Sequence, residues 1–270
     1  LMTHRLYLND DWLFTEQFED SLVETEYPEN TLQPVRLPHT CKETPFHYFD
    51  ESLYQMVSGY RRHLQIPADW QGKQILLTFE GVAHDSTVFC NGKKVGEHHC
   101  GYTAFTVDLT DNVLYGQDNL LCVRLDSREN LNVPPFGYVI DYMTYGGIYR
   151  DVRLEVKEKV SLSDIFVHTA IDFSSSPVTA QLTSEITLTE SDENVTIRQY
   201  YMPKSTAAAQ ESWKLLCEQT VSADASCDKE LSLTATITDP LLWDTEEANL
   251  YILKTQLYQD NTLLDETETT

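Results

Sequence analysis

The stretch VAHDSTVFCNGKKV, from Val82 to Val95, places the dipeptide Asn91-Gly92 between two runs of strand-favouring residues. Asn-Gly is the strongest short-range signal for a two-residue hairpin turn, because both positions tolerate positive φ. The stretch therefore predicts an antiparallel hairpin. The same organisation, short runs between turn signals, continues on both sides of it.

Five further runs in the first half alternate apolar and polar residues or are bounded by turn residues, whereas amphipathic helical periodicity is nearly absent. Strands this close together, with little helix between them, indicate an antiparallel β-sandwich. The runs cover residues 60–66, 74–79, 105–108, 120–125 and 152–156.

The character of the sequence changes around Lys157-Glu158-Lys159, after which aromatic residues become fewer and Ser and Thr increase. Short β-runs at 179–189, 195–201, 231–237 and 250–257 predict an immunoglobulin-like sandwich. The register of 179–189 is ambiguous, because Ser184 and Thr187 both face outward only if a bulge intervenes. We therefore expect an all-β protein with domains at 1–157 and 158–270.

The chain has 270 residues, with 19 basic and 43 acidic side chains and a net charge of −24. This charge argues against nucleic acid and anionic membranes as partners, because both are polyanions. No apolar stretch approaches the ~20 residues of a membrane span. The residues after Met2 contain no signal-peptide core, so a cytoplasmic location is expected.

The six cysteines form no CxxC pair and no Cys/His zinc spacing. Reduced buried thiols are expected, with a Cys90–Cys100 bridge as the leading alternative. His98 and His99 lie beside Cys100, but no second cluster accompanies them at metal-binding spacing. The sequence therefore predicts no metal site and no cofactor.

A series of motifs, each of them short, runs in order along nearly the whole chain. They are Trp12-Leu13-Phe14, Val35-Arg36-Leu37-Pro38-His39-Thr40, Gly59-Tyr60-Arg61-Arg62, Phe79-Glu80-Gly81-Val82, Asn91-Gly92-Lys93-Lys94-Val95-Gly96-Glu97-His98, Gly101-Tyr102-Thr103-Ala104-Phe105, the run DYMTYGGIYRDV from Asp141 to Val152, and Pro240-Leu241-Leu242-Trp243-Asp244.

Together these motifs resemble the N-terminal region of glycoside hydrolase family 2. The resemblance implies a jelly-roll sugar-binding domain, then an immunoglobulin-like domain, then a (β/α)₈ barrel that carries two catalytic Glu. Retaining hydrolysis needs two carboxyls about 5–5.5 Å apart, and no defensible pair occurs in this sequence. We therefore expect no catalytic residue within 1–270 and a native polypeptide that continues beyond Thr270.

The resemblance also implies a sugar contact from Asp141, which opens the DYMTYGGIYRDV run. A carboxylate can accept hydrogen bonds from two sugar hydroxyls, although an Asp that only forms a turn is the alternative. Phe136, Tyr138 and Tyr142 are candidates for stacking on the sugar, or else for packing on the barrel. The family's Asn before the Gly59-Tyr60 strand is unmatched, and Gln55 lies nearest to that position.

Within the same run, the pair Gly146-Gly147 predicts positive φ or a close backbone approach. Arg150 beside Asp151 predicts an ion pair that holds the turn. On the strand of Arg61 and Arg62, one side chain is expected to point inward and to pair with a carboxylate or a carbonyl.

These features predict the non-catalytic N-terminal part of a retaining β-glycosidase. A β-galactosidase is the preferred enzyme, and a β-glucuronidase or a β-mannosidase is the alternative within the same family. A carboxylate at Asp141 would repel an acidic sugar, which favours a neutral one. The expected partners are a β-linked carbohydrate, the barrel and further copies of the chain; whether the whole enzyme uses a sodium or divalent ion is left open. The alternatives are a stand-alone carbohydrate-binding module and an adhesion protein.

Overall fold

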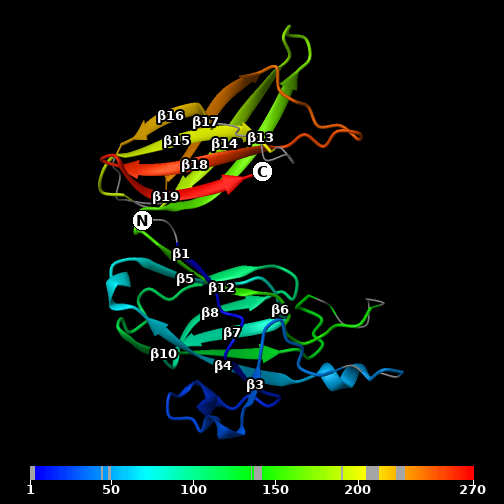
Figure 1. The fold of residues 1–270 in the computed structure, drawn as a ribbon. Helices are drawn as coiled ribbons and strands as arrows, with labels where there is room; N and C mark the ends of the chain where they lie inside the picture. Colours follow the sequence, from blue (N-terminus) through cyan, green and yellow to red (C-terminus); the bar gives the residue numbers. More distant parts are fainter. Residues whose placement is uncertain are drawn as a thin grey trace. The chain divides into compact units, whose positions relative to one another are not determined.

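The computed structural model describes residues 4–43, 45–47, 50–134, 136, 142–189, 191–204, 213–222 and 229–270. They form two compact units, His4–Val156 and Lys157–Thr270. Strands dominate both units (Figure 1), so the all-β prediction is confirmed. None of the described helices is long or apolar enough to cross a membrane.

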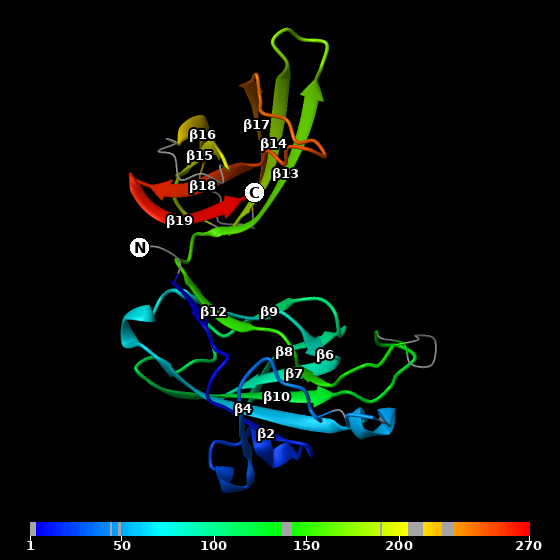
Figure 2. The same cartoon turned by 45° about the vertical axis from the view of Figure 1, so that its right-hand side comes forward.

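The first unit has a four-stranded and a six-stranded antiparallel sheet (Figure 2). The four-stranded sheet has the order β1 (His4–Tyr7), β12 (Val152–Lys157), β5 (Gln74–Phe79) and β9 (Phe105–Asp108). The six-stranded sheet has the order β3 (Gln33–Val35), β2 (Trp12–Thr15), β4 (Val57–Ile66), β10 (Gln117–Asp126), β7 (Asp85–Cys90) and β8 (Lys93–His99). A small sheet pairs β11 (Gly147–Ile148) with β6 (Val82–Ala83), and four 3₁₀ turns are described, η1 (Asp20–Val23), η2 (Glu29–Thr31), η3 (Glu51–Tyr54) and η4 (Ala68–Trp70).

The core of this unit draws its side chains from both large sheets. Tyr60 and Leu121 of the six-stranded sheet and Ile75, Leu77 and Leu154 of the four-stranded sheet are completely buried in one cluster. Burying an aliphatic or aromatic side chain of this size contributes about 1.5–3 kcal/mol. Each of the five strands predicted in this half of the sequence is present.

The predicted hairpin is confirmed as β7 and β8, which pair antiparallel across Asn91 and Gly92. Both turn residues have positive φ, 50° for Asn91 and 79° for Gly92, as a type I′ turn requires. The Asn91 side chain also donates to the carbonyl of Asn112 at 2.9 Å and accepts from the Leu120 amide at 2.9 Å. Asn91 therefore fixes the turn against β10.

The first part of strand β4, residues 58–61, is buried on both faces, because the segment 16–32 covers the side turned away from the main core. Arg61 points into this second cluster and is completely buried. Its guanidinium donates to the Leu22 and Glu24 carbonyls and to Glu29 Oε1, the last at 2.9 Å. The prediction that one arginine of this strand points inward is confirmed.

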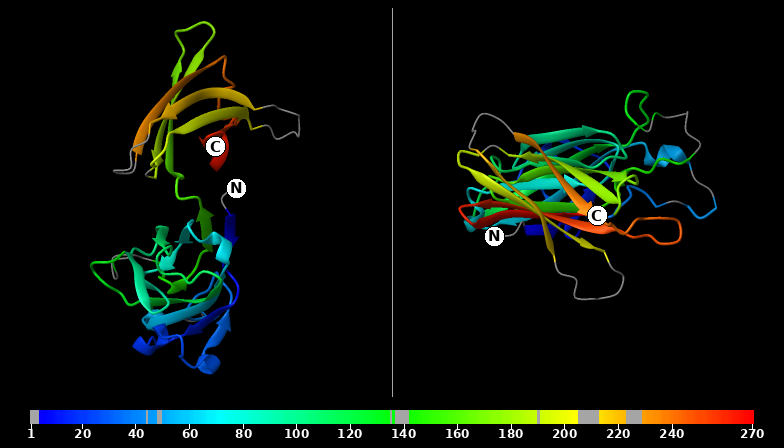
Figure 3. Two further views of the ribbon diagram at one scale, coloured as in Figure 1. Left: turned by 90° about the vertical axis from the view of Figure 1, so that its left-hand side faces the viewer. Right: turned by 90° about the horizontal axis from the view of Figure 1, so that it is seen from above.

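The second unit has a three-stranded and a four-stranded antiparallel sheet, and β13 and β14 form a long hairpin (Figure 3). Its core includes Leu162, Ile186, Ile197, Leu233 and Leu257. This is the predicted immunoglobulin-like sandwich. The sheets are β13 (Leu162–Asp172), β14 (Thr179–Leu188) and β17 (Lys229–Thr238), and β16 (Lys214–Val221), β15 (Val195–Pro203), β18 (Tyr251–Gln259) and β19 (Thr262–Thr269).

The ambiguous register of β14 has a simple solution in the structure. Ser184 faces the core together with Leu182 and Ile186, and Thr187 faces outward, without a bulge in β14. The irregularity lies in β13, between Leu162 and Asp164. The sequence alone left this register open, and in the structure the polar Ser184 occupies an inward position.

Candidate functional site

The DYMTYGGIYRDV run is anchored in the structure through its second half. Ile148 is completely buried and pairs with Val82 of β6. The His39 amide donates to the Ile148 carbonyl at 2.8 Å, and the Cys41 amide donates to the Gly146 carbonyl at 2.8 Å. The run is therefore held against the segment that contains the Leu37-Pro38-His39 motif.

His39 itself is a hydrogen-bonded structural residue. Its Nδ1 lies 2.9 Å from the Tyr60 hydroxyl, and its ring contacts Phe14 edge-on at 4.8 Å. Burial lowers the pKa of His39, so it is neutral near pH 7.

Both glycines of the run have a geometric reason. A Cβ on Gly146 would lie 2.6 Å from the Ser127 side chain, and Gly147 has a φ of +135°. A Cβ on Gly147 would lie 2.3 Å from the His39 carbonyl oxygen. The predictions of close approach and positive φ are both confirmed, and the pair lets the run lie flat on residues 39–41.

Beside this anchored run lies a hollow of about 250 Å³, which we name the tyrosine hollow. Four tyrosines give it an aromatic lining, and the exposed fractions of Tyr102, Tyr142 and Tyr145 are 44%, 54% and 45%. Exposed aromatic rings with hydroxyls at their tips can stack on the apolar face of a sugar and hydrogen-bond its edge. The lining residues are Ala83, Gly101, Tyr102, Tyr142, Met143, Thr144, Tyr145, Tyr149 and Arg150.

Hydrogen bonds fix the walls of the tyrosine hollow. The Tyr102 and Tyr142 hydroxyls lie 2.7 Å apart. The Tyr149 hydroxyl donates to the Gly101 carbonyl at 2.5 Å, and the Tyr145 ring contacts Tyr54 edge-on at 5.5 Å. Burial and the hydrogen bond to Tyr142 raise the pKa of Tyr102, so its hydroxyl keeps its proton throughout the physiological range.

The predicted ion pair between Arg150 and Asp151 was wrong. Asp151 instead accepts a hydrogen bond from Asn9 Nδ2 at 2.9 Å. The Arg150 guanidinium lies over the Tyr149 ring, 5.4 Å from its centroid, and within the described ranges no carboxylate forms an ion pair with it. Adjacent residues of an extended chain point in opposite directions, which explains why sequence neighbours do not pair here.

Of the three predicted sugar-binding residues that the structure describes, Tyr142 lines the tyrosine hollow. Gln55 closes η3, and its Oε1 accepts from the Glu129 amide at 2.8 Å, so that it braces a loop. Phe136 is 45% exposed and is not among the lining residues. Asp141 and Tyr138 lie outside the described residues.

Sequence reasoning did not single out Tyr102, Tyr145 and Tyr149 as site residues. All three stand inside quoted motifs, Gly101-Tyr102-Thr103 and the run from Asp141 to Val152. Nothing in the spacing of these motifs shows that residues 102 and 142 meet, because the contact joins two loops that are distant in sequence.

The cysteines and histidines around residue 98 have ordinary structural roles. Cys90 and Cys100 are both free thiols, so the alternative of a bridge between them was wrong, and burial raises the pKa of Cys90 to about 11. His98 lies 2.9 Å from the Thr103 hydroxyl, and His99 lies 2.8 Å from Asp85. Within the part of the chain that the structure describes, no group of side chains is placed to hold a metal ion.

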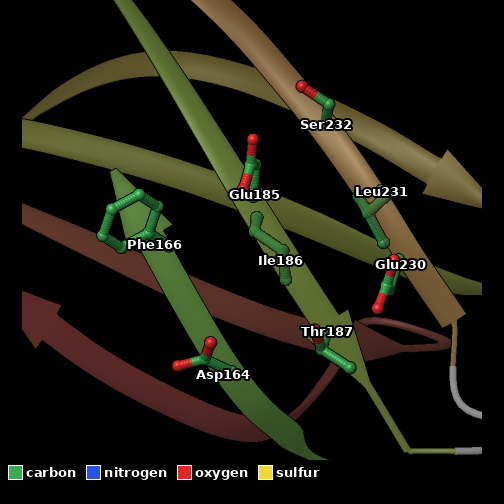
Figure 4. A pocket seen from close by; sticks show the side chains of 8 residues that line it. All are labelled: Asp164, Phe166, Glu185, Ile186, Thr187, Glu230, Leu231 and Ser232. Atoms are coloured by element: carbon green, nitrogen blue, oxygen red, sulfur yellow. The ribbon is translucent and has the colours of Figure 1, made fainter. Parts of the chain in front are cut away.

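A second hollow, of about 370 Å³, lies on the sheet formed by β13, β14 and β17 (Figure 4). Three carboxylates and a single aromatic ring surround it, and Glu185 also contacts His168 at 3.1 Å. It lacks the clustered rings of the tyrosine hollow and is the weaker candidate for a sugar. Its lining residues are Asp164, Phe166, Glu185, Ile186, Thr187, Glu230, Leu231 and Ser232.

Both units of the chain match models of a known protein family. Residues 17–158 match the model described as glycosyl hydrolases family 2, sugar binding domain. Residues 160–270 match the model described as glycosyl hydrolases family 2.

Individual glycosidases also match this chain over nearly its whole length. The chain is 32% identical over 261 residues to a β-galactosidase of Thermoanaerobacter pseudethanolicus, covering 96% of this chain and 34% of that protein. It is 28% identical over 273 residues to a β-glucuronidase of Bacteroides fragilis, covering 96% and 36%. The crystal structure of a Bacteroides uniformis β-glucuronidase has a TM-score of 0.83 at 25% identity and covers 98% of this chain and 32% of its own. The chain thus spans about a third of the length of these relatives.

Proposed function

Since this chain belongs to glycoside hydrolase family 2, we propose that it is the non-catalytic N-terminal part of a retaining β-galactosidase. The observation that carries the proposal is the match of both units, in order, to a relative of that name. In this proposal a barrel elsewhere in the polypeptide supplies the acid/base and the nucleophile. Hydrolysis of terminal β-linked sugars is then an activity of the longer protein.

The tyrosine hollow is the contribution of this chain to the sugar site. Tyr142 lies in it directly after Asp141, the residue that the family resemblance implies in sugar binding. Its half-exposed ring offers a stacking surface, and the Asp141 carboxylate offers two acceptors for sugar hydroxyls. Both groups recognise a neutral polyhydroxylated ring.

A panel of nitrophenyl glycosides tests the reaction. A polypeptide of the relatives' length that contains this chain should hydrolyse the β-galactoside with kcat/KM at least about tenfold above the β-glucuronide and β-mannoside. A preference for the glucuronide would replace the galactosidase proposal with the second candidate. Binding of β-galactosides without any hydrolysis would favour a carbohydrate-binding module instead.

The second candidate, a β-glucuronidase, has one structural observation in its favour. Arg150 lines the tyrosine hollow and forms no ion pair with the described carboxylates, so it could receive the carboxylate of an acidic sugar. Relatives named β-glucuronidase also match over nearly the whole chain. Against it stands Asp141, because a second carboxylate close to an acidic sugar is repulsive.

The role of Asp141 is tested by Asp141→Ala in the longer polypeptide. We expect kcat/KM to fall at least tenfold, or about 1.4 kcal/mol. Asp69→Ala, which removes an exposed carboxylate on η4 of the same unit, is the control and should leave the kinetics unchanged. Equal kinetics for the two variants would make Asp141 a turn residue.

We further propose that the whole enzyme is a homo-oligomer and that this chain contributes to its interfaces. Light scattering of the longer polypeptide measures its mass directly, and a monomer at assay concentrations would contradict this part of the proposal.

A further inference from the structure

The turn at Gly101 and Tyr102 is held by three hydrogen bonds from different parts of the first unit. The Gly101 amide donates to the Pro134 carbonyl at 3.1 Å, and the Gly101 carbonyl accepts from the Tyr149 hydroxyl at 2.5 Å. Both backbone groups of Gly101 are therefore engaged. The third bond joins the hydroxyls of Tyr102 and Tyr142, 2.7 Å apart.

Tyr142 depends on this turn for its orientation. It lies outside the regular strands, and its side chain is 54% exposed. An exposed tyrosine in an irregular segment samples several rotamers, and fixing one of them costs side-chain entropy. The Tyr102 hydroxyl is the hydrogen-bond partner that the structure describes for the Tyr142 hydroxyl, so this contact selects one orientation of the Tyr142 ring before any ligand arrives.

We propose that Tyr102 is a positioning residue, which holds the ring of Tyr142 in the orientation that stacks on the sugar. This inference rests on the proposed function and deepens it. Tyr102 acts through Tyr142, and its own support is the anchored backbone of Gly101. Orientation fixed before binding reduces the entropy lost on binding, so the contact improves the affinity for substrate and leaves the chemical step unchanged.

The test uses the longer polypeptide with nitrophenyl β-galactoside and three variants, Tyr102→Phe, Tyr142→Phe and the double variant. Tyr102→Phe keeps the ring and removes only the hydroxyl. We expect its KM to rise about three- to tenfold with kcat within about twofold of wild type. The double variant should be no worse than Tyr142→Phe, because both single changes remove the same contact.

Tyr115→Phe is the matched control, since the Tyr115 hydroxyl donates to the Thr110 carbonyl at 3.1 Å, away from the tyrosine hollow. It should leave KM unchanged. Thermal unfolding of every variant separates positioning from stability: we expect Tyr102→Phe to melt within about 2 °C of Tyr115→Phe.

Tyr142→Ala distinguishes failure of the inference from failure of the proposed site. If Tyr142→Ala raises KM at least about tenfold while Tyr102→Phe behaves like Tyr115→Phe, the positioning role is overturned and the proposed site stands. If Tyr142→Ala leaves KM unchanged, Tyr142 does not contact substrate, and the site and the inference both fail. Additive effects of Tyr102→Phe and Tyr142→Phe would also overturn the inference.

Discussion

Gly147 occupies a position where a side chain meets two separate obstacles. Its φ of +135° is outside the range that L side chains adopt readily, and a Cβ would lie 2.3 Å from the His39 carbonyl oxygen and 3.0 Å from Thr40 Cα. Backbone atoms cannot rotate away as the end of a side chain can. We expect Gly147→Ala to lower the free energy of unfolding by about 3 kcal/mol or more, measured by urea denaturation.

Gly72→Ala is the control for the backbone conformation alone. Gly72 has a φ of +88°, and nothing would lie within 4 Å of a Cβ at that position. Its substitution should cost about 1 kcal/mol, which reflects the left-handed conformation. Equal losses at the two positions would show that the close approach at Gly147 contributes nothing.

Single residues show both where sequence reasoning succeeds and where it fails. The need for glycine at 146 and 147 could be predicted, because few constraints other than positive φ or a close approach call for two adjacent glycines. The partner of Arg150 could not, since sequence adjacency to Asp151 says nothing about where a guanidinium stacks. The Tyr102–Tyr142 contact was equally invisible, because it depends on how two loops meet.

Among the elements, the segment that carries η1 and η2 is attached to β4 and β10 by a charged network. His63 lies on β4 between Glu29 of η2, at 3.0 Å, and Asp118 of β10, at 2.5 Å, and Glu29 also accepts from the buried Arg61. Burial lowers the pKa of His63, but the hydrogen bonds to Asp118 and Glu29 outweigh it, and the net pKa is raised. The folded state therefore favours protonated His63.

The sign of the pH dependence follows from that direction. Because the folded pKa of His63 lies above the unfolded one, its contribution is fully present below the unfolded pKa and is lost as the pH rises through the folded pKa. His63→Gln should therefore lower the melting temperature more at about pH 5.5 than at about pH 8.5. The pKa of Glu29 is lowered in the folded state, so its contribution to stability has the opposite pH dependence. That contribution is lost only as the pH falls through the folded pKa of Glu29, in stronger acid. A melting-temperature difference that is the same at both pH values would contradict the assignment.

Strand β14 gives a prediction about an inward polar group. Ser184 is 1% exposed, and its Oγ has no hydrogen-bond partner among the described residues. A buried hydroxyl without a partner costs free energy. We expect Ser184→Ala to stabilise the second unit by about 1 kcal/mol in chemical denaturation. The control is Thr183→Ala, on the outward face of the same strand. Destabilisation by Ser184→Ala would show that the Ser184 hydroxyl has a hydrogen-bond partner.

The same strand shows what limits sequence reasoning about elements. The hairpin of β7 and β8 could be predicted, because Asn91-Gly92 specifies its turn locally. The register of β14 could not, because the side of the sheet that Ser184 faces depends on its neighbours β13 and β17. Turn chemistry is local, whereas pairing register is set by the sheet.

On the scale of the whole molecule, motif order predicted the architecture better than it predicted the site. The sequence contains many weak signals for strands and turns that indicate the same fold, so the all-β prediction does not depend on any one of them. The tyrosine hollow depends on a few loop contacts, each of which must be known individually. The set of residues that line the tyrosine hollow could therefore not be predicted from the sequence.

The chain of 270 residues, expressed alone, should fold and yet hydrolyse no nitrophenyl glycoside. Each unit has its own buried core, so cooperative unfolding is expected. Retaining hydrolysis needs one protonated and one ionised carboxyl about 5–5.5 Å apart, and the adjacent acids Glu246 and Glu247 do not provide such a pair. Both are exposed in the loop between β17 and β18, where their amides donate to Asp244.

Activity assays on this chain and on the longer polypeptide, at equal molar concentrations, test whether the isolated chain is catalytically inactive. The longer polypeptide should release nitrophenol, and the isolated chain should remain at the rate of the buffer alone. Because trace contamination can imitate slow turnover, any signal from the isolated chain must also be lost on a point substitution within 1–270 to count against the prediction. Turnover that passes this test would place catalytic carboxyls in the two sandwiches, and the barrel would then not be required for the chemistry.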